Sequence, residues 1–341
     1  MKKAHYFQHI LHFQNPSGTS RGVLRSKETF ILEVSEDGRK GIGECGIFRG
    51  LSCDDVPEYE AKLKWLCENI NEHPDVLKQE LRQFPSIWFG YEQAIRNMKY
   101  GENVYFPSSF TTGKVPIKIN GLIWMGKPDF MLKQIEEKLA KGFSCIKLKI
   151  GVDWQAERSI LTDLRTKFPA DRLELRVDAN GGFSFDEAKV GLQELAQLKI
   201  HSIEQPIKKA DSNVPYKNSP MAMLCAETAI PIALDEELIG INDFESKQNL
   251  LRQIQPQYII LKPSLVGGFA GTDEWISIAE NLGIGWWITS ALESNIGLNA
   301  IAQYTFTKNP YIPQGLGTGG LFTNNYDSAL DLRGDLLFFR P

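Results

Sequence analysis

The fold is decided by residues 173–182, Leu-Glu-Leu-Arg-Val-Asp-Ala-Asn-Gly-Gly, where an apolar strand leads directly into acidic and amide groups. Side chains alternate between the two faces of a strand, so Arg176, Asp178 and Asn180 share one face and the apolar side chains share the other. The two glycines that follow let a backbone and a ligand approach closely. The stretch therefore predicts a ligand site at the end of a buried strand, with an ordinary polar turn as the alternative.

From Val115 onward, short apolar strands alternate with amphipathic helices. Eight strands are expected, the last with the weakest pattern: residues 115–120, 145–150, 173–178, 202–205, 232–235, 258–262, 285–289 and 314–317. Ser184 opens a capping box for one helix, and Asp153 can cap another. Spacings of about thirty residues are typical of βα units with parallel strands and right-handed crossovers. Eight such strands favour a closed barrel over an open sheet, which would be expected to carry a glycine-rich dinucleotide turn.

Residues 1–112 predict a separate α+β unit. It has three expected strands and two expected helices: residues 5–13, 29–34 and 41–44, and residues 56–70 and 87–100. Two segments rich in Gly, Ser, Pro and Asp, residues 15–20 and 47–55, are expected to be loops. Loops of this kind often contact substrate.

Length and composition narrow the class of protein. A chain of 341 residues suggests one large barrel or two domains. A net charge of −4 gives no general attraction for nucleic acid or an anionic membrane, so a small-molecule partner is expected. No run of 18 apolar residues occurs, and histidines interrupt the segment after the basic start, which predicts a soluble cytoplasmic protein. The five cysteines lack CxxC spacing, which indicates reduced thiols. The oligomeric state stays open.

Polar residues recur at the carboxyl end of strand after strand. They are Lys147, Lys149, Asp178, Asn180, Glu204, Asp235, Lys262, Ser290 and Glu293. The intervals from Lys149 through Asp178, Glu204 and Asp235 to Lys262 are 29, 26, 31 and 27 residues, each the length of one βα unit. In a barrel all these residues converge on one mouth, where the active sites of this architecture lie.

Three carboxylates from consecutive strands would repel one another in a dry barrel mouth. Mg²⁺ is the natural counterion, because it prefers oxygen ligands and leaves positions free for water and substrate oxygens. The alternative is that Asp178, Glu204 and Asp235 each pair with a lysine. Lys149 and Lys262 come from the second and sixth strands, on opposite sides of the ring. Burial and a nearby cation would both lower the pKa of such a lysine and make it a usable base.

The sequence resembles the enolase superfamily, in its muconate lactonizing enzyme-like subgroup, across almost the whole chain. The segments that carry the resemblance are Lys147-Leu148-Lys149, Asp178-Ala179-Asn180, Glu204-Gln205-Pro206, Asp235-Glu236 and Lys262-Pro263-Ser264. The resemblance implies an α/β fold, a modified (β/α)₇β TIM barrel over residues 113–320. An α+β capping domain, residues 1–112 completed by residues 321–341, would cover it.

The resemblance also implies roles for individual residues. Asp178, Glu204 and Asp235 are expected to bind Mg²⁺, with Mn²⁺ as the alternative ion, while Lys149 and Lys262 form the acid/base pair. Candidate substrate-binding residues are Lys147, Arg176, Asn180, Ser264, Ser290, Glu293 and Ser294. Arg21 and Arg25, near the first expected loop, are further candidates.

Within the subgroup, residues 262–265 and 290–294, together with Arg176, are most similar to the o-succinylbenzoate synthases. This similarity implies a Mg²⁺-dependent hydro-lyase of menaquinone biosynthesis that acts on a small-molecule carboxylate. Dipeptide epimerases and N-acylamino acid or N-succinylamino acid racemases share the lysines and carboxylates and stay open as alternatives. A non-catalytic barrel that binds a metal or an anion is a more distant alternative.

Overall fold

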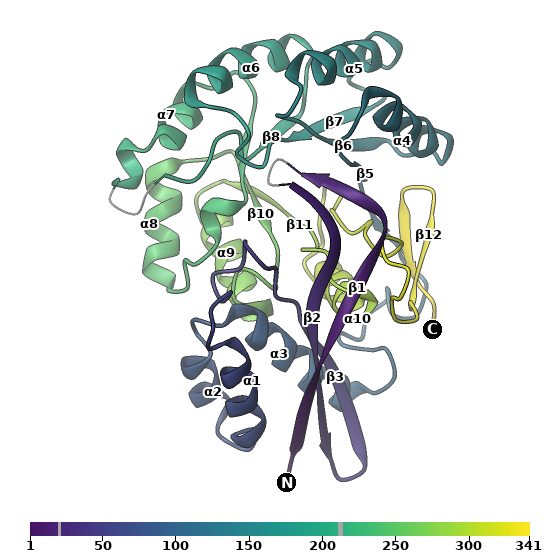
Figure 1. Cartoon of the computed structure of the whole chain (residues 1–341), viewed down its shortest axis with the longest axis vertical. Helices are drawn as coiled ribbons and strands as arrows, with labels where there is room; N and C mark the ends of the chain where they lie inside the picture. Colours follow the sequence, from purple (N-terminus) through teal and green to yellow (C-terminus); the bar gives the residue numbers. More distant parts are fainter. Residues whose placement is uncertain (20–21, 211–213) are drawn as a thin grey trace.

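The computed structural model describes residues 1–19, 22–210 and 214–341. A curved parallel sheet surrounded by helices forms one part, and a separate antiparallel sheet with its own helices forms the other (Figure 1). The expected combination of a barrel and an α+β cap is confirmed.

The parallel sheet contains seven strands, which neighbour one another in chain order. They are β5 (Gly121–Ile123), β6 (Cys145–Lys149), β7 (Glu174–Asp178), β8 (Ser202–Glu204), β9 (Ile232–Leu234), β10 (Tyr258–Leu261) and β11 (Gly285–Ile288). Six of the predicted barrel strands, the second to the seventh, are thereby confirmed to within a residue or two at their ends. A parallel sheet in chain order is what successive right-handed βα units produce.

The predicted first barrel strand, residues 115–120, is wrong in its position. Its central part, β4 (Ile117–Lys118), pairs antiparallel with β13 (Leu336–Phe339), and the first strand of the parallel sheet is the shorter β5. Alternation of apolar side chains predicts a strand but does not reveal its neighbours, which explains the error.

The weakly predicted eighth strand consists of single bridges at Gln314 and Gly315. Gln314 pairs with Ile119, and Gly315 pairs with Thr289, both in parallel. The Asn120 N–H donates to the Gln314 carbonyl (2.9 Å), and the Gly315 N–H donates to the carbonyl of Ile288 (2.9 Å). This segment therefore links β11 to the residues just before β5 and closes the ring.

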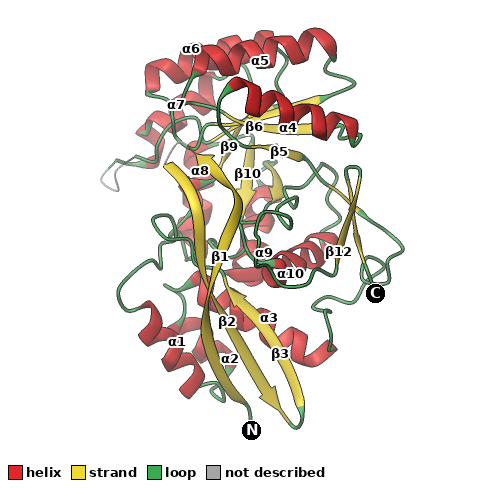
Figure 2. Ribbon diagram, turned by 45° about the vertical axis from the view of Figure 1, so that its right-hand side comes forward, coloured by secondary structure: helices red, strands yellow, loops and turns green. Residues whose placement is uncertain are grey.

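Helices cover the outside of the curved sheet (Figures 1 and 2). They are α4 (Pro128–Ala140), α5 (Trp154–Lys167), α6 (Phe185–Gln197), α7 (Pro220–Glu227), α8 (Phe244–Ile254), α9 (Gly268–Asn281) and α10 (Asn295–Thr307), with 3₁₀ turns at Tyr216–Asn218 and Glu236–Leu238. The expected capping box of α6 is present between Ser184 and Glu187, and Asp153 caps α5. These local signals are confirmed because they depend only on neighbouring residues.

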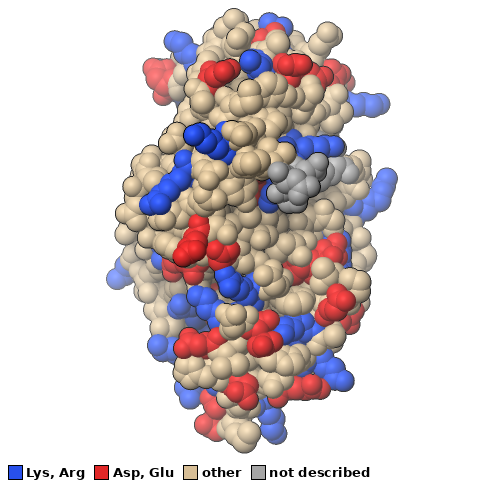
Figure 3. Space-filling model, turned by 90° about the vertical axis from the view of Figure 1, so that its left-hand side faces the viewer, with Lys and Arg blue, Asp and Glu red and all other residues tan. Residues whose placement is uncertain are grey.

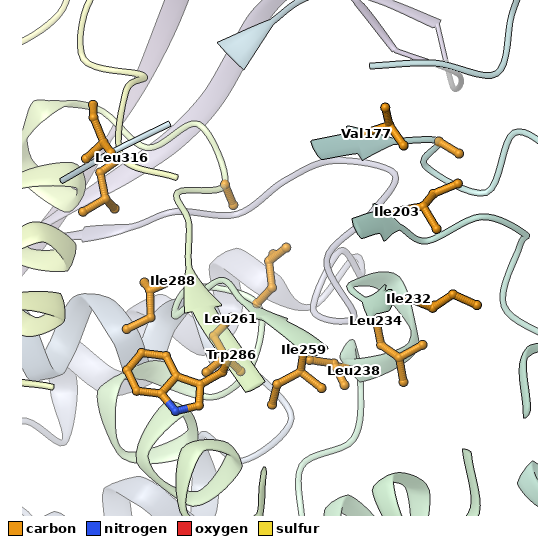
Figure 4. Packing of buried hydrophobic residues seen from close by; sticks show 14 of the residues in the cluster. Val177, Ile203, Ile232, Leu234, Leu238, Ile259, Leu261, Trp286, Ile288 and Leu316 are labelled. Atoms are coloured by element: carbon orange, nitrogen blue, oxygen red, sulfur yellow. The ribbon is translucent and has the colours of Figure 1, made fainter. Parts of the chain in front are cut away.

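The strands divide their side chains between two cores. Outward residues of β7 to β11, such as Val177, Ile203 and Ile259, form an arc of apolar side chains against the helices (Figure 4). Inward residues Ala233, Ile260 and Trp287 form a second, small apolar cluster. The polar inward residues at the carboxyl ends of the strands, described below, lie above this cluster.

The N-terminal unit is built on β1 (Lys3–Thr19), β2 (Gly22–Glu36) and β3 (Arg39–Cys45), an antiparallel sheet packed against α1 (Tyr59–Glu68), α2 (Pro74–Glu80) and α3 (Pro85–Tyr100). The short helix α2 was not predicted. The long β1–β2 hairpin extends from these helices to the barrel (Figure 2).

One predicted loop of this unit is wrong. Residues 15–19 belong to β1, where a register shift between His12 and Ser17 accommodates Asn15 and Pro16. A bulge lets a strand continue through residues that are usually found in turns. Ser20, the last residue of that predicted loop, lies outside the described residues. The second predicted loop, residues 47–55, contains neither a helix nor a strand.

The end of the chain contacts both parts. The Gln14 N–H donates to the Leu321 carbonyl (2.8 Å), so residues after the barrel reach β1. The final hairpin of β12 (Leu330–Arg333) and β13 instead pairs with β4. The exact division into domains stays a prediction.

Other predictions concern the surface and the cysteines. The five cysteines are free thiols. Within the described ranges, no helix has the length and apolar character needed to cross a membrane. Basic and acidic side chains are interspersed on the face shown in Figure 3.

Asp54 gives a test of the N-terminal unit. It is fully buried, and its Oδ2 accepts hydrogen bonds from the Ser86 N–H (2.9 Å) and hydroxyl (2.7 Å) at the start of α3. Burial raises the pKa of Asp54 to about 6. Because the pKa of Asp54 is higher in the folded protein than in the unfolded chain, the protonated side chain contributes stability below the unfolded-state pKa. This contribution is lost as the pH rises through about 6.

We therefore expect the wild-type protein to lose up to about 3 kcal/mol of stability, relative to Asp54→Asn, between pH 4 and pH 7. Urea unfolding of both proteins across this range measures the difference. Parallel pH profiles would contradict the prediction.

Candidate active site

A cavity lies at the carboxyl ends of the barrel strands. Six of the predicted site residues line it: Lys147, Lys149, Asp178, Asn180, Lys262 and Ser290. The N-terminal unit contributes Leu24, Phe48 and Leu51 to the same wall. The cavity is therefore formed jointly by the barrel and its cap.

Strand register aligns three of the charged residues. Lys149 of β6 lies opposite Asp178 of β7, and Asp178 lies opposite Glu204 of β8. Asp235 and Lys262 follow directly after β9 and β10. Because alternate side chains of a barrel strand point inward, all five side chains meet inside the mouth.

Each of the three lysines at the mouth is held by carboxylates. Lys147 Nζ lies 3.0 Å from Asp178 Oδ2 and 2.5 Å from Glu204 Oε2. Lys149 Nζ lies 2.9 Å from Asp178 Oδ2 and donates to Asn180 Oδ1 at 2.6 Å. Two lysines therefore share one buried aspartate.

Lys262 completes the network on the opposite side. It forms an ion pair with Asp235, and its Nζ lies 3.8 Å from Glu204 Oε1. Three lysines thus neutralise three carboxylates, which is the alternative that the sequence left open. Pairing of this kind is what allows buried charges to persist.

The pKa values follow from burial and pairing. Burial acts to raise the pKa of Asp178, but the Lys147 and Lys149 ammonium groups outweigh it and hold this pKa well below its usual range. Burial, reinforced by the charge of Asp178, raises the pKa of Glu204 to about 7. Burial acts to lower the pKa of Lys147 and of Lys262, yet the neighbouring carboxylates raise both. The expectation of a lowered pKa, which rested on a nearby cation as well as on burial, does not hold for Lys262 in this arrangement.

The three carboxylates offer a donor set for a hard cation. Glu204 Oε1 is buried and has no hydrogen-bond partner among the described residues. Across the described residues, no three His, Cys, Asp or Glu side chains are gathered closely enough to hold a metal ion. In this arrangement Lys147 and Lys262 lie between the carboxylates. The residue types fit Mg²⁺, provided that the ammonium groups move away from the oxygens that would bind it.

Asn180 and Ser290 are the remaining predicted residues at the cavity wall. The Asn180 side chain donates to Glu236 Oε1 (3.2 Å) while it accepts from Lys149, so it orients that lysine. The Ser290 hydroxyl is hydrogen-bonded to the Thr318 hydroxyl (2.6 Å).

Four predicted substrate-binding residues do not line this cavity: Arg176, Ser264, Glu293 and Ser294. Arg176 lies deeper in the barrel, where it donates to Glu174 (2.7 Å) and to the Pro313 carbonyl (2.9 Å) and stacks on Trp287. The inward direction of a side chain does not reveal whether that side chain lies at the bottom of the barrel or at its mouth. Arg25 is exposed on β2, and Arg21 lies outside the described residues.

Several wall residues were not predicted, above all Asn120 and Trp124, which flank β5. The centroid of the Trp124 ring lies 5.8 Å from Lys149 Nζ, and Asn120 Oδ1 is buried without a hydrogen-bond partner in the part of the chain that the structure describes. Asn120 precedes β5, so the signal of a polar residue at the carboxyl end of a barrel strand does not identify it. The apolar residues of the cap left no such signal.

Comparison with known proteins adds independent information. Residues 131–319 match the family model described as enolase C-terminal domain-like. The chain is 44% identical to the o-succinylbenzoate synthase of Desulfotalea psychrophila, and the match covers 97% of each protein.

Solved structures agree. The crystal structure of MenC from Desulfotalea psychrophila has a TM-score of 0.86 at 40% identity, covering 99% of each chain. A dipeptide epimerase from Enterococcus faecalis, complexed with Mg and the dipeptide L-Leu-L-Tyr, has a TM-score of 0.81 at 19% identity, covering 99% of this chain and 96% of that one. The second likeness concerns the fold alone.

The position of Arg176 generates a prediction. Arg176→Met keeps an apolar contact with Trp287 but removes the guanidinium that donates to the Pro313 carbonyl and to Glu174. We expect the free energy of unfolding to fall by about 1–3 kcal/mol. Urea denaturation measures this loss, and Arg172→Met, at an exposed position, is the control. Equal stability of both variants would show that the buried guanidinium is dispensable.

Proposed function

Because the chain belongs to the enolase superfamily, we propose that it dehydrates 2-succinyl-6-hydroxy-2,4-cyclohexadiene-1-carboxylate to o-succinylbenzoate, a step of menaquinone biosynthesis. The observation that carries the proposal is that Lys149 of β6 and Lys262, directly after β10, line opposite sides of one cavity beside three carboxylates. The identity of 44% to an o-succinylbenzoate synthase supports the same reaction.

Lys149 is the proposed base. As a neutral amine it removes the proton next to the ring carboxylate, and Asn180 keeps it oriented. Negative charge then develops on the carboxylate oxygens, where the Lys262 ammonium stabilises it. The protonated Lys149 returns the proton to the departing hydroxyl group. Aromatisation of the ring favours this second step, so proton removal is the demanding one.

Asp178, Glu204 and Asp235 are the proposed ligands of Mg²⁺, with Mn²⁺ as the alternative ion. The bound ion would supply positive charge next to the substrate carboxylate.

The rest of the wall suits the remainder of the substrate. Trp124 and Leu292, with the apolar residues of the cap, would hold the ring and exclude water. Thr318, Ser290 and Asn120 provide hydroxyl and amide groups for the polar succinyl chain.

The direct test is incubation of the purified protein with the cyclohexadiene substrate and Mg²⁺. We expect o-succinylbenzoate to form, and absence of product above background would refute the proposal. Solvent deuterium that enters dipeptides or N-succinylamino acids would instead indicate a racemase or epimerase. Because one enzyme can catalyse both the isotope exchange and the dehydration, both assays are needed.

The two lysines should respond differently to substitution. Lys149→Arg should abolish dehydration, because an arginine cannot deprotonate near neutral pH. Lys262→Arg keeps the charge and should retain measurable turnover, whereas Lys262→Ala should lose roughly 3–4 kcal/mol of transition-state stabilisation. Steady-state kinetics of the three variants measure this. The reverse pattern for the two arginine variants would exchange the assigned roles.

Metal binding should depend on the carboxylate with the unsatisfied oxygen. Glu204→Gln should weaken Mg²⁺ binding by about 10- to 100-fold, because one charged ligand is lost. Isothermal titration calorimetry of the substrate-free protein with Mg²⁺ measures the affinity. Glu245→Gln, at an exposed position, is the control. Equal affinities in the two variants would remove Glu204 from the ligand set.

A further inference from the structure

Two carboxylates of the N-terminal unit occupy the N-termini of two barrel helices. Glu92 of α3 accepts the N–H groups of Phe269 (2.6 Å) and Ala270 (3.2 Å) at the start of α9. Glu44 of β3 accepts the N–H groups of Ser294 (2.9 Å) and Gly297 (3.0 Å) at the start of α10. The first turn of a helix has unpaired N–H groups and a positive potential, so it binds anions well.

Glycine residues leave space for both carboxylates. A Cβ atom at Gly268 would lie 2.2 Å from Glu92 Oε2, and one at Gly297 would lie 2.8 Å from Glu44 Oε2. A side chain at Gly268 would push Glu92 away from α9, and a side chain at Gly297 would push Glu44 away from α10. Helix α3 lies against α9, which brings Glu92 within reach, and strand β3 lies against α10, which brings Glu44 within reach.

These helices begin directly after the loops that carry active-site residues. The Lys262 carbonyl accepts the Leu265 N–H (2.8 Å), and the Gly268 N–H donates to the Pro263 carbonyl (2.8 Å). The backbone is thus tied by hydrogen bonds from Lys262 to the first residue of α9, where Glu92 holds it.

A second set of contacts joins the two loops to each other. The Ser264 hydroxyl donates to Glu293 Oε1 (2.5 Å), and Glu293 Oε2 accepts the N–H of Ala291 (2.7 Å), a cavity-wall residue. The Ser294 hydroxyl donates to Glu44 (2.5 Å). All these side chains except Glu92 are fully buried.

We propose that Glu92 and Glu44, through Ser264, Glu293 and Ser294, form a carboxylate clamp by which the cap positions the loops of Lys262 and Ser290. The five residues are positioning residues and do not bind substrate. The inference rests on the proposed function, because its consequence is the placement of the Lys262 ammonium. It also explains why three of the predicted substrate-binding residues lie outside the cavity.

Glu92→Ala tests the clamp. We expect kcat for dehydration to fall about 10- to 100-fold at a temperature where circular dichroism shows a folded protein, since small displacements of a catalytic group have effects of this size. The matched control is Glu245→Ala, an exposed acidic residue in the first turn of α8, which should keep wild-type kcat. Formate, a small carboxylate, should partly restore the activity of Glu92→Ala and leave the control unchanged.

A double variant separates positioning from stability. If Glu92 acts through Lys262, the loss caused by Glu92→Ala should be smaller in a Lys262→Arg background than in the wild type. A purely structural role would lower the thermal midpoint, leave kcat of the folded enzyme intact and show no coupling, which would overturn the clamp.

The remaining outcomes are also decisive. If Glu92→Ala does not fold, Glu92→Gln replaces it, because the amide keeps the shape but loses the charge and one acceptor. Wild-type kcat in the folded Gln variant would overturn the clamp. Absence of turnover in the wild type would refute the proposed function instead, so the two failures are distinguishable.

Discussion

Burial of six charged groups at the mouth of the barrel is the constraint on which the rest of the structure depends. Lys147, Lys149 and Lys262 face Asp178, Glu204 and Asp235 with almost no access to solvent. An isolated charge in such a place would be strongly destabilising, so this group of charges is stable only when charges alternate or a cation takes part. The surrounding apolar residues hold these side chains in place. The same residues remove the water that would weaken their interactions during a reaction.

The cap is part of this arrangement. Its apolar residues Leu24, Phe48 and Leu51 close the cavity, while Glu44 and Glu92 reach past it to the helices behind the loops. Barrel helix N-termini commonly bind anionic ligands. Here the protein's own carboxylates occupy two of them, so the polar surface of the cap is used for positioning and its apolar surface for enclosure.

The sequence was most informative where chemistry and local periodicity coincide. Lys149, Asp178 and Glu204 could be placed at one mouth because each lies one βα unit from the next and strand alternation fixes its face. The caps of α5 and α6 could be read for the same reason, since a helix start depends on four adjacent residues. The pairing of lysines with carboxylates was foreseen as an alternative, yet the raised pKa values of Lys147 and Lys262 required actual distances.

The sequence by itself therefore determined the second to the seventh barrel strands and the charged residues at their carboxyl ends. Only the tertiary structure decided that residues 117–118 pair with the C-terminal hairpin, that Arg176 lies below the mouth and that Ser264, Glu293 and Ser294 face the cap. Periodicity reports which side of a strand or helix is buried but not what covers it. The depth of a side chain in the barrel, and its partner from a distant segment, depend on packing between elements that the local pattern does not encode.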